Sequence, residues 1–106
     1  MVYYSEQALI DLENIFDGLI NWSSCNGQRH MDYDSVVNYF NDIVDICDSL
    51  DGLSFHSKSK YKRHQKFGTY VYSYNRNKNT TWYIIYEKYE DIISIYRIMN
   101  NYLTNF

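Results

Sequence analysis

The amino-acid sequence predicts a single α+β domain in which two helices precede an antiparallel sheet. Up to about residue 50, apolar residues recur at intervals of three and four, which is the period of amphipathic helices. After residue 68 apolar and polar residues alternate, which is the period of half-buried strands. A chain of 106 residues with 45% hydrophobic residues is long enough for one modest core without a metal or a disulfide.

Residues 2–20 predict a short strand followed by an amphipathic helix. Residues 2–4 are prone to form a strand and are expected at a sheet edge. Ser5 is a favourable N-cap, and Glu6 places a negative charge in the first helical turn. The helix is expected over about residues 6–20. Its apolar positions are Ala8, Leu9, Leu12, Ile15, Phe16, Leu19 and Ile20.

A second helix is predicted to follow a polar loop over residues 22–31. Asp32 or Asp34 is in position to cap its N-terminus, and Gly52 follows its end. The two helices are expected to form an antiparallel hairpin with one shared apolar seam. The apolar stripe of the second helix consists of Val36, Val37, Phe40, Ile43, Val44, Cys47 and Leu50.

Three aromatic-rich segments predict a β-meander after a polar loop over residues 53–68. The continuous apolar run of the middle segment is typical of a central strand that is buried on both faces. The three segments are Thr69–Tyr74, Thr81–Glu87 and Ile92–Met99. Tyr70, Tyr72 and Tyr74 share one face of the first strand, as sheet core or as a platform for stacking bases, and core is the preferred interpretation.

Charge is distributed unevenly along the chain. Residues 1–55 contain ten acidic side chains and one basic side chain, whereas residues 56–106 contain nine basic and three acidic side chains. This asymmetry suggests one face for a polyanion or an acidic partner. The alternative is that the two halves pair with each other.

The sequence gives no indication of a membrane span, a signal peptide or a metal site. No apolar run reaches the length of a spanning helix, so a cytoplasmic location is expected. Cys47 falls on an apolar stripe and Cys25 in a polar loop, so no disulfide between them is expected. Cys and His spacings do not indicate zinc, and no cofactor is expected.

Three segments carry a family resemblance that covers nearly the whole chain. Ser5–Phe16 is similar to a first helix with Ala, Asp-Leu and Ile-aromatic positions. Lys66–Arg76 is similar to the opening of a hairpin, and Ile95–Met99 is similar to a last strand with a characteristic arginine. In this order they resemble the RelE/ParE superfamily, the toxins of bacterial type II toxin–antitoxin systems. Asn100 differs from the histidine that is frequent there, and the basic tail of the family is absent.

The resemblance implies one RelE/ParE-like toxin domain over residues 1–106, with a cognate antitoxin as its partner. It leaves two activities open. One is metal-independent, ribosome-dependent cleavage of messenger RNA, which inhibits translation. The other is inhibition of DNA gyrase without catalysis. A third interpretation is a member that only binds a protein partner, which the net charge of −3 favours.

For mRNA cleavage, the resemblance places basic residues around the scissile phosphate. Arg97, Arg63 and His64 are the candidate catalytic residues. Arg97 can hold a phosphate with two parallel hydrogen bonds, and the ordinary pKa of histidine, about 6.5, suits proton transfer. The candidate nucleic-acid-binding residues are Lys58, Lys60, Lys62, Lys66, Tyr61 and Tyr102.

Each of these assignments has a structural alternative. The basic run over residues 58–66 is then a solvated loop that faces the acidic helices or the antitoxin. Arg97 then forms a salt bridge with an antitoxin carboxylate or with Glu87 on the neighbouring strand. His64 is then an ordinary polar loop residue, and Tyr102 owes its position to the abundance of tyrosine.

Overall fold

The computed structural model describes residues 1–23 and 32–101 of the chain. The elements are β1 (Val2–Tyr4), α1 (Glu6–Ser23), α2 (Tyr33–Asp48), a 3-10 turn η2 (Leu50–Gly52), α3 (Lys62–Gln65), β2 (Tyr70–Asn77), β3 (Thr80–Tyr89) and β4 (Ile92–Asn100). The predicted order of a short strand, two helices and a three-stranded meander is confirmed. The short helix α3 is new, because the sequence predicts a loop there.

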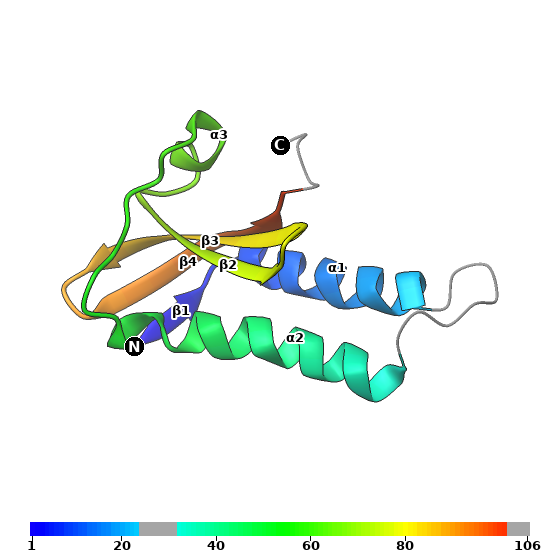
Figure 1. Ribbon diagram of the computed structural model, residues 1–106. Coiled ribbons are helices and arrows are strands. Elements are labelled where there is room, and N and C mark those ends of the chain that lie inside the picture. The colour runs from blue at the N-terminus through cyan, green and yellow to red at the C-terminus, as the bar shows by residue number, and fades with distance from the viewer. Residues whose placement is uncertain (24–31, 102–106) are drawn as a thin grey trace.

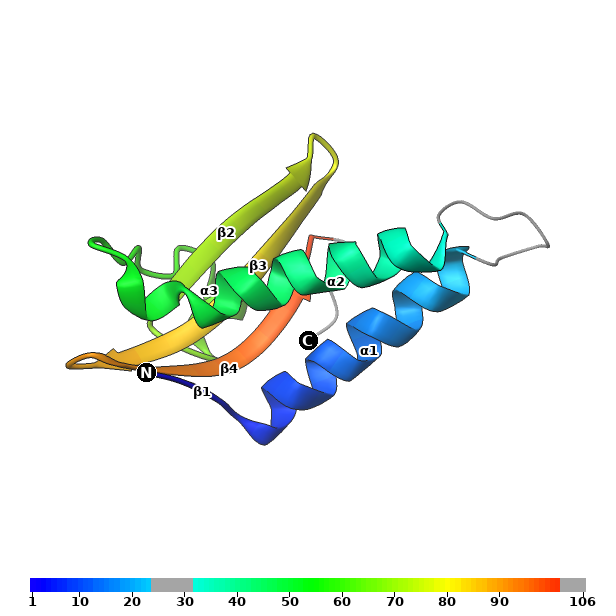
Figure 2. The same ribbon diagram turned by 90° about the horizontal axis from the view of Figure 1, so that it is seen from below.

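The four strands form one sheet in the order β1-β4-β3-β2. β2, β3 and β4 are antiparallel neighbours, whereas β1 lies parallel to β4 from Val2 opposite Ile93 to Tyr4 opposite Ile95. β1 is therefore an edge strand and β3 a central strand, as predicted. Helices α1 and α2 pack against one face of the sheet, and α3 lies over the other face (Figures 1 and 2).

Side-chain caps begin both long helices at the predicted positions. The hydroxyl of Ser5 accepts a hydrogen bond of 3.0 Å from the backbone N–H of Ala8. The carboxylate of Asp32 accepts one of 2.8 Å from the backbone N–H of Ser35. Each cap satisfies a donor that the first helical turn leaves without a partner, and this fixes where each helix starts.

The main core fills the space between the helical pair and the sheet. Its buried side chains include Ala8, Leu12, Ile15, Tyr39, Ile43, Cys47, Leu50, Trp82, Ile84, Tyr86, Ile93, Ile95 and Ile98. Tyr70, Tyr72 and Tyr74 pack against this cluster, which confirms that they belong to the core. Burial, with the negative charge of Asp48, raises the pKa of the Cys47 thiol to about 12. Cys25 lies outside the described residues.

A β-bulge in β4 changes which face its side chains reach. Ile85 of β3 lies opposite Arg97, but the next residue, Tyr86, lies opposite Ile95, so Tyr96 has no opposite residue. Ile95 and Ile98 consequently both face the main core, although they are three residues apart. Without the bulge, Arg97 would follow Ile95 into that core by simple alternation.

The described helices include none that is both long and apolar enough to cross a membrane.

Gly68 allows the segment after α3 to lie directly on β3. A Cβ atom at this position would lie 2.9 Å from Cγ2 of Ile85 and 3.0 Å from the carbonyl oxygen of Tyr86. The second contact is with backbone, which cannot rotate away. Only glycine therefore lets the α3 segment close onto the sheet.

Gly68→Ala is expected to lower the free energy of unfolding by about 1–3 kcal/mol, because the added methyl group must push the segment off the strand. Thermal denaturation followed by circular dichroism measures the change. Gly18→Ala is the matched control, because nothing lies within 4 Å of a Cβ at this helical position. It should raise stability by about 1 kcal/mol. Equal stability of Gly68→Ala and the wild type would contradict the close packing.

Candidate nucleic-acid interface

The basic run is held against the sheet by backbone contacts at the free edge of β2. The carbonyl of Ser57 accepts a hydrogen bond of 3.0 Å from Val71 N–H, and Ser59 N–H donates one of 2.7 Å to the carbonyl of Thr69. The side chain of Gln65 donates to the carbonyl of Ser59. These bonds carry the chain across to the face where α3 lies (Figure 1).

The cationic side chains of this run are directed to solvent. Lys58, Lys60, Lys62 and Lys66 are exposed, and Arg63 is half-buried with its guanidinium over the ring of Tyr61. No ion pair joins Lys58, Lys60, Lys62 or Arg63 to a residue within 1–23 or 32–101. The helix α3 lies on the sheet face opposite the acidic helices (Figure 1). The run therefore does not face those helices, contrary to one of the alternatives.

Two arginines outside the run do pair with the acidic helices. Nη1 of Arg76 lies 2.5 Å from a carboxylate oxygen of Asp42, and its guanidinium stacks over the ring of Tyr39. Arg97 pairs with Asp11 of α1. The prediction that the halves of the chain pair with each other thus holds for these two arginines.

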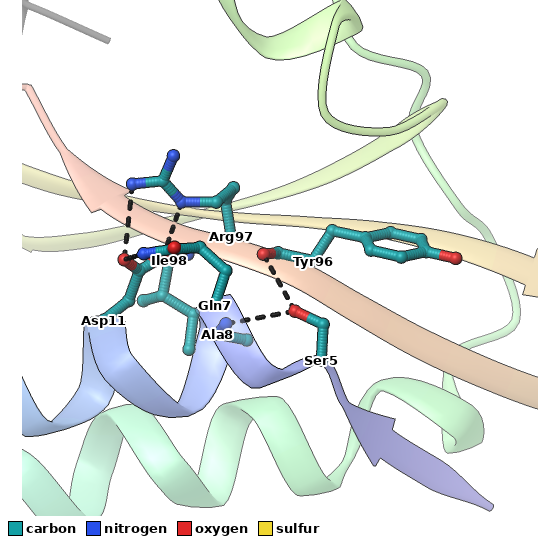
Figure 3. Close-up of polar contacts among 7 residues, drawn as sticks. All are labelled: Ser5, Gln7, Ala8, Asp11, Tyr96, Arg97 and Ile98. Atoms are coloured by element: carbon teal, nitrogen blue, oxygen red, sulfur yellow. Dashed lines mark hydrogen bonds and ion pairs between the residues drawn. The ribbon is translucent and has the colours of Figure 1, made fainter.

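Arg97 and Asp11 form a buried, two-contact ion pair. Nε of Arg97 lies 2.8 Å from Oδ2 of Asp11, and Nη2 lies 3.2 Å from Oδ1 (Figure 3). The same Oδ2 accepts a hydrogen bond of 2.9 Å from Ile98 N–H, and Gln7 donates to Oδ1. The side chains of Arg97 and Asp11 are only 14% and 7% exposed. The carboxylate bound to Arg97 is therefore one that the sequence interpretation did not name, and Glu87 instead accepts a hydrogen bond from Thr69 N–H.

His64 lies beneath the surface between two tyrosines. It is 1% exposed, and its ring centroid lies 4.6 Å from that of Tyr83 and 5.3 Å from that of Tyr61. Neither ring nitrogen has a hydrogen-bond partner among the described residues. Burial, and then the positive charge of Arg63, lowers the pKa of His64 below its ordinary value. The imidazole is therefore neutral near pH 7.

A groove of about 570 Å³ opens beside His64. Its lining residues are Leu53, Phe55, Ser57, Lys58, Lys60, Tyr61, His64, Val71, Tyr72, Ser73, Asn75, Thr81, Tyr83 and Tyr86. Two lysines, three tyrosines besides the buried Tyr86, and several hydroxyl and amide groups thus converge on one concave surface. Such mixed polar and aromatic walls suit a small planar ligand that carries charge.

The α3 segment brings several predicted site residues to one sheet face. Phe67 lies 4.8 Å from the guanidinium carbon of Arg97, while His64 lies on Tyr83. Tyr83 is two residues from Ile85, which lies opposite Arg97, so the two contacts are about 7 Å apart along β3. His64 and Arg97 therefore both lie under the α3 segment, whereas the guanidinium of Arg63 lies over Tyr61. Tyr102 lies outside the described residues.

Two polar groups of this region were missed from the sequence. Asp11 is a charged residue in an amphipathic helix, but its position three residues after Ala8 and four before Ile15 places it on the buried side. His56 lies in the predicted loop over residues 53–68, and its Nδ1 lies 2.7 Å from the hydroxyl of the buried Tyr86. Burial, with Tyr70 nearby, raises the pKa of Tyr86 to about 12. No sequence pattern indicates that second pair.

Comparisons with family models, curated proteins and solved structures find no match, so the family resemblance stays a prediction. Within the described part of the chain, no group of three His, Cys, Asp or Glu side chains is arranged to hold a metal ion.

Asp11→Ala is expected to destabilise the fold by about 3–5 kcal/mol, because it leaves the Arg97 charge and the Ile98 N–H buried without this partner. Chemical denaturation measures the loss. Asp17→Ala, an exposed carboxylate on the same helix, is the control and should change stability by less than about 0.5 kcal/mol. The double variant Asp11→Ala, Arg97→Met should recover part of the loss, and a double variant as unstable as the sum of both single changes would argue against a coupled pair.

His64 should make stability depend on pH. Its pKa is lowered in the folded protein, so the unfolded chain binds this proton more readily. The stability associated with neutral His64 is fully present above the ordinary value of 6.5 and is lost as the pH falls below it. When the pH is lowered from about 7.5 to about 5.5, the melting temperature of His64→Phe should therefore fall by less than that of the wild type. Parallel pH profiles of the two proteins would show that His64 does not titrate in this way.

Proposed function

We propose that this protein is the toxin of a type II toxin–antitoxin pair and that it inhibits translation by cleaving messenger RNA. The observation that carries the proposal is the exposed basic run on the same sheet face as Arg97, His64 and the groove. Exposed lysines without an internal ion pair suit the phosphates of a nucleic-acid backbone. The acidic helices lie on the opposite face, where they do not repel the RNA at close range.

The proposed chemistry is attack of a ribose 2′-hydroxyl on the adjacent phosphorus. The P–O2′ bond forms as the P–O5′ bond breaks, the 2′-hydroxyl loses its proton to water, and the departing 5′-oxygen takes one from water. Lys58, Lys60 and Lys62 hold the backbone, and the guanidinium of Arg63 stabilises the negative charge that develops on the phosphate oxygens. Arg97 lies at the edge of the same surface and contributes to the field there. His64 is enclosed, so proton transfer by its imidazole requires the ring of Tyr61 to turn away.

The proposed partners follow from the same surface. An antitoxin with a flexible acidic segment would cover the basic run and exclude RNA. The ribosome would present the message as an unpaired strand. We place this activity in the cytoplasm of a bacterium, where messages and ribosomes are found.

A second function has one observation in its favour. Arg97 is bound by the Asp11 carboxylate through two contacts, which offsets much of its charge before any phosphate arrives. A member of this kind would act by binding only, either on DNA gyrase or on another protein. The groove and the unpaired lysines have no role in that interpretation, which is why we favour RNA cleavage.

Expression in growing bacteria tests the proposal. The wild type should arrest translation and leave cleaved messages, and Lys60→Ala with Lys62→Ala should reduce cleavage about tenfold or more, because backbone contacts are lost. Message ends are mapped by primer extension, and DNA supercoiling is followed in the same cultures. The control is Lys78→Ala with Lys88→Ala, which removes two exposed lysines outside the run and should leave toxicity intact.

Other outcomes would decide against cleavage. Loss of supercoiling with intact messages would indicate the gyrase mode, and normal growth in the presence of folded wild-type protein would exclude a toxin. Arg97→Ala is a weaker test, because it also leaves the buried Asp11 carboxylate without its cation. A loss of activity in that variant must be compared with its thermal stability.

A further inference from the structure

His64 is the least satisfied polar side chain of this surface. It is 1% exposed, yet neither ring nitrogen bonds to any residue of the described chain. Leaving a buried polar group without a partner is energetically costly, and native proteins contain few such groups. A phenylalanine could pack between the same tyrosines without that cost. Because the unsatisfied imidazole lies in the wall of a groove, it points to a ligand that enters the groove and bonds to the ring.

The groove supplies the other contacts that such a ligand needs. Its volume of about 570 Å³ is in the range of sites for small organic molecules. Tyr61 and Tyr83 lie on two sides of His64, and Lys58 and Lys60 line the same space. Aromatic rings with lysines beside them suit a planar, aromatic group attached to a phosphate.

We propose that this groove binds an unpaired nucleobase of single-stranded RNA, with His64 bonded to the base edge, Tyr61 stacked on its face and Lys58 and Lys60 on the flanking phosphates. The inference rests on the proposed function, since it takes RNA as the ligand. It adds that the protein holds its RNA by a base as well as by the backbone.

The chemistry of His64 favours a base over a simple anion. A neutral imidazole can offer a base edge either an N–H donor or a nitrogen acceptor, and base edges present groups that match each of these. Phosphate and carboxylate oxygens only accept, so they can bond to the neutral ring through its single N–H alone. The lowered pKa of His64 is consistent with the neutral form.

Tyr61 is suited to admit the base. It is 54% exposed, whereas Tyr83 beneath His64 is half-buried in the sheet. A base therefore reaches the enclosed nitrogens when the Tyr61 ring turns outward, and the displaced ring is then available for stacking. Stacking of a base on an aromatic side chain strengthens binding in other single-strand-binding proteins.

The test uses the full-length protein and two labelled oligonucleotides that carry equal charge. One is a 2′-O-methyl RNA hexamer, which cannot be cleaved by its own 2′-oxygen, and the other has the same backbone with all bases removed. Fluorescence anisotropy should show that the wild type binds the first about tenfold more tightly than the second. Nitrogen NMR of the His64 ring should show shifts with the first oligonucleotide alone.

Variants separate the base contact from the backbone contacts. His64→Phe keeps the stacking and backbone contacts but loses the bond to the base edge, so its preference for the hexamer with bases should be smaller than that of the wild type, and it should melt at the same or a higher temperature. His64→Gln, which keeps a donor and an acceptor, should show an intermediate preference. Lys62→Ala, outside the groove lining, should weaken the binding of both oligonucleotides to the same extent.

The inference is overturned if the wild type does not prefer the hexamer with bases, if the His64 ring signals do not respond, or if folded His64→Phe keeps the wild-type preference. Because neither probe is cleaved, these results are independent of whether messages are cut in cells.

Discussion

The carboxylate of Asp11 ties the helical layer to the sheet. Strand β4 pairs with β1 from Ile93 to Ile95, and beyond that point no strand within residues 1–23 or 32–101 lies along its outer edge. Helix α1 supplies the missing partners. Asp11 accepts from Ile98 N–H, and Ser5 bonds to the carbonyls of Ile95 and Tyr96. The helix thereby protects an edge that would otherwise be open to pairing with another chain.

This contact also decides which face of the sheet is available for function. With α1 held at the β4 edge and α2 packed beside it, the main core occupies one face (Figure 2). The opposite face receives only the short α3 segment, which Gly68 allows to lie against Ile85. This short segment covers the face only in part, and the groove beside His64 opens there.

The same arrangement sorts the charges of the molecule. Asp11 and Asp42 are paired with Arg97 and Arg76, so these arginines stabilise the fold. Lys58, Lys60 and Lys62 form no ion pair within the described part of the chain, and their side chains are exposed. A net charge of −3 therefore hides a surface that can attract a polyanion. His64, whose buried ring nitrogens have no hydrogen-bond partner among the described residues, lies in this same region. Such local departures from a well-satisfied structure are expected at binding sites.

Local patterns determined most of the architecture. The periods of apolar residues predicted two helices, a meander and a central β3. Short-range capping chemistry at Ser5, and at Asp32 or Asp34, predicted where the helices begin. These features depend on residues a few positions apart, so a single sequence contains them. The same patterns predicted a cluster of cations over residues 58–66, but not the short helix within it or the sheet face on which it lies.

Tertiary structure decided the site itself. Alternation along β4 places Arg97 on the core side with Ile95, but the bulge at Tyr96 turns it to the other face. The bulge depends on how β4 pairs with β3, and the Asp11 contact joins residues 86 positions apart. The burial of His64 likewise depends on Tyr83, which comes from a strand that follows it in the chain. Each of these features depends on contacts between segments that are far apart in the sequence, so no local sequence pattern predicts it.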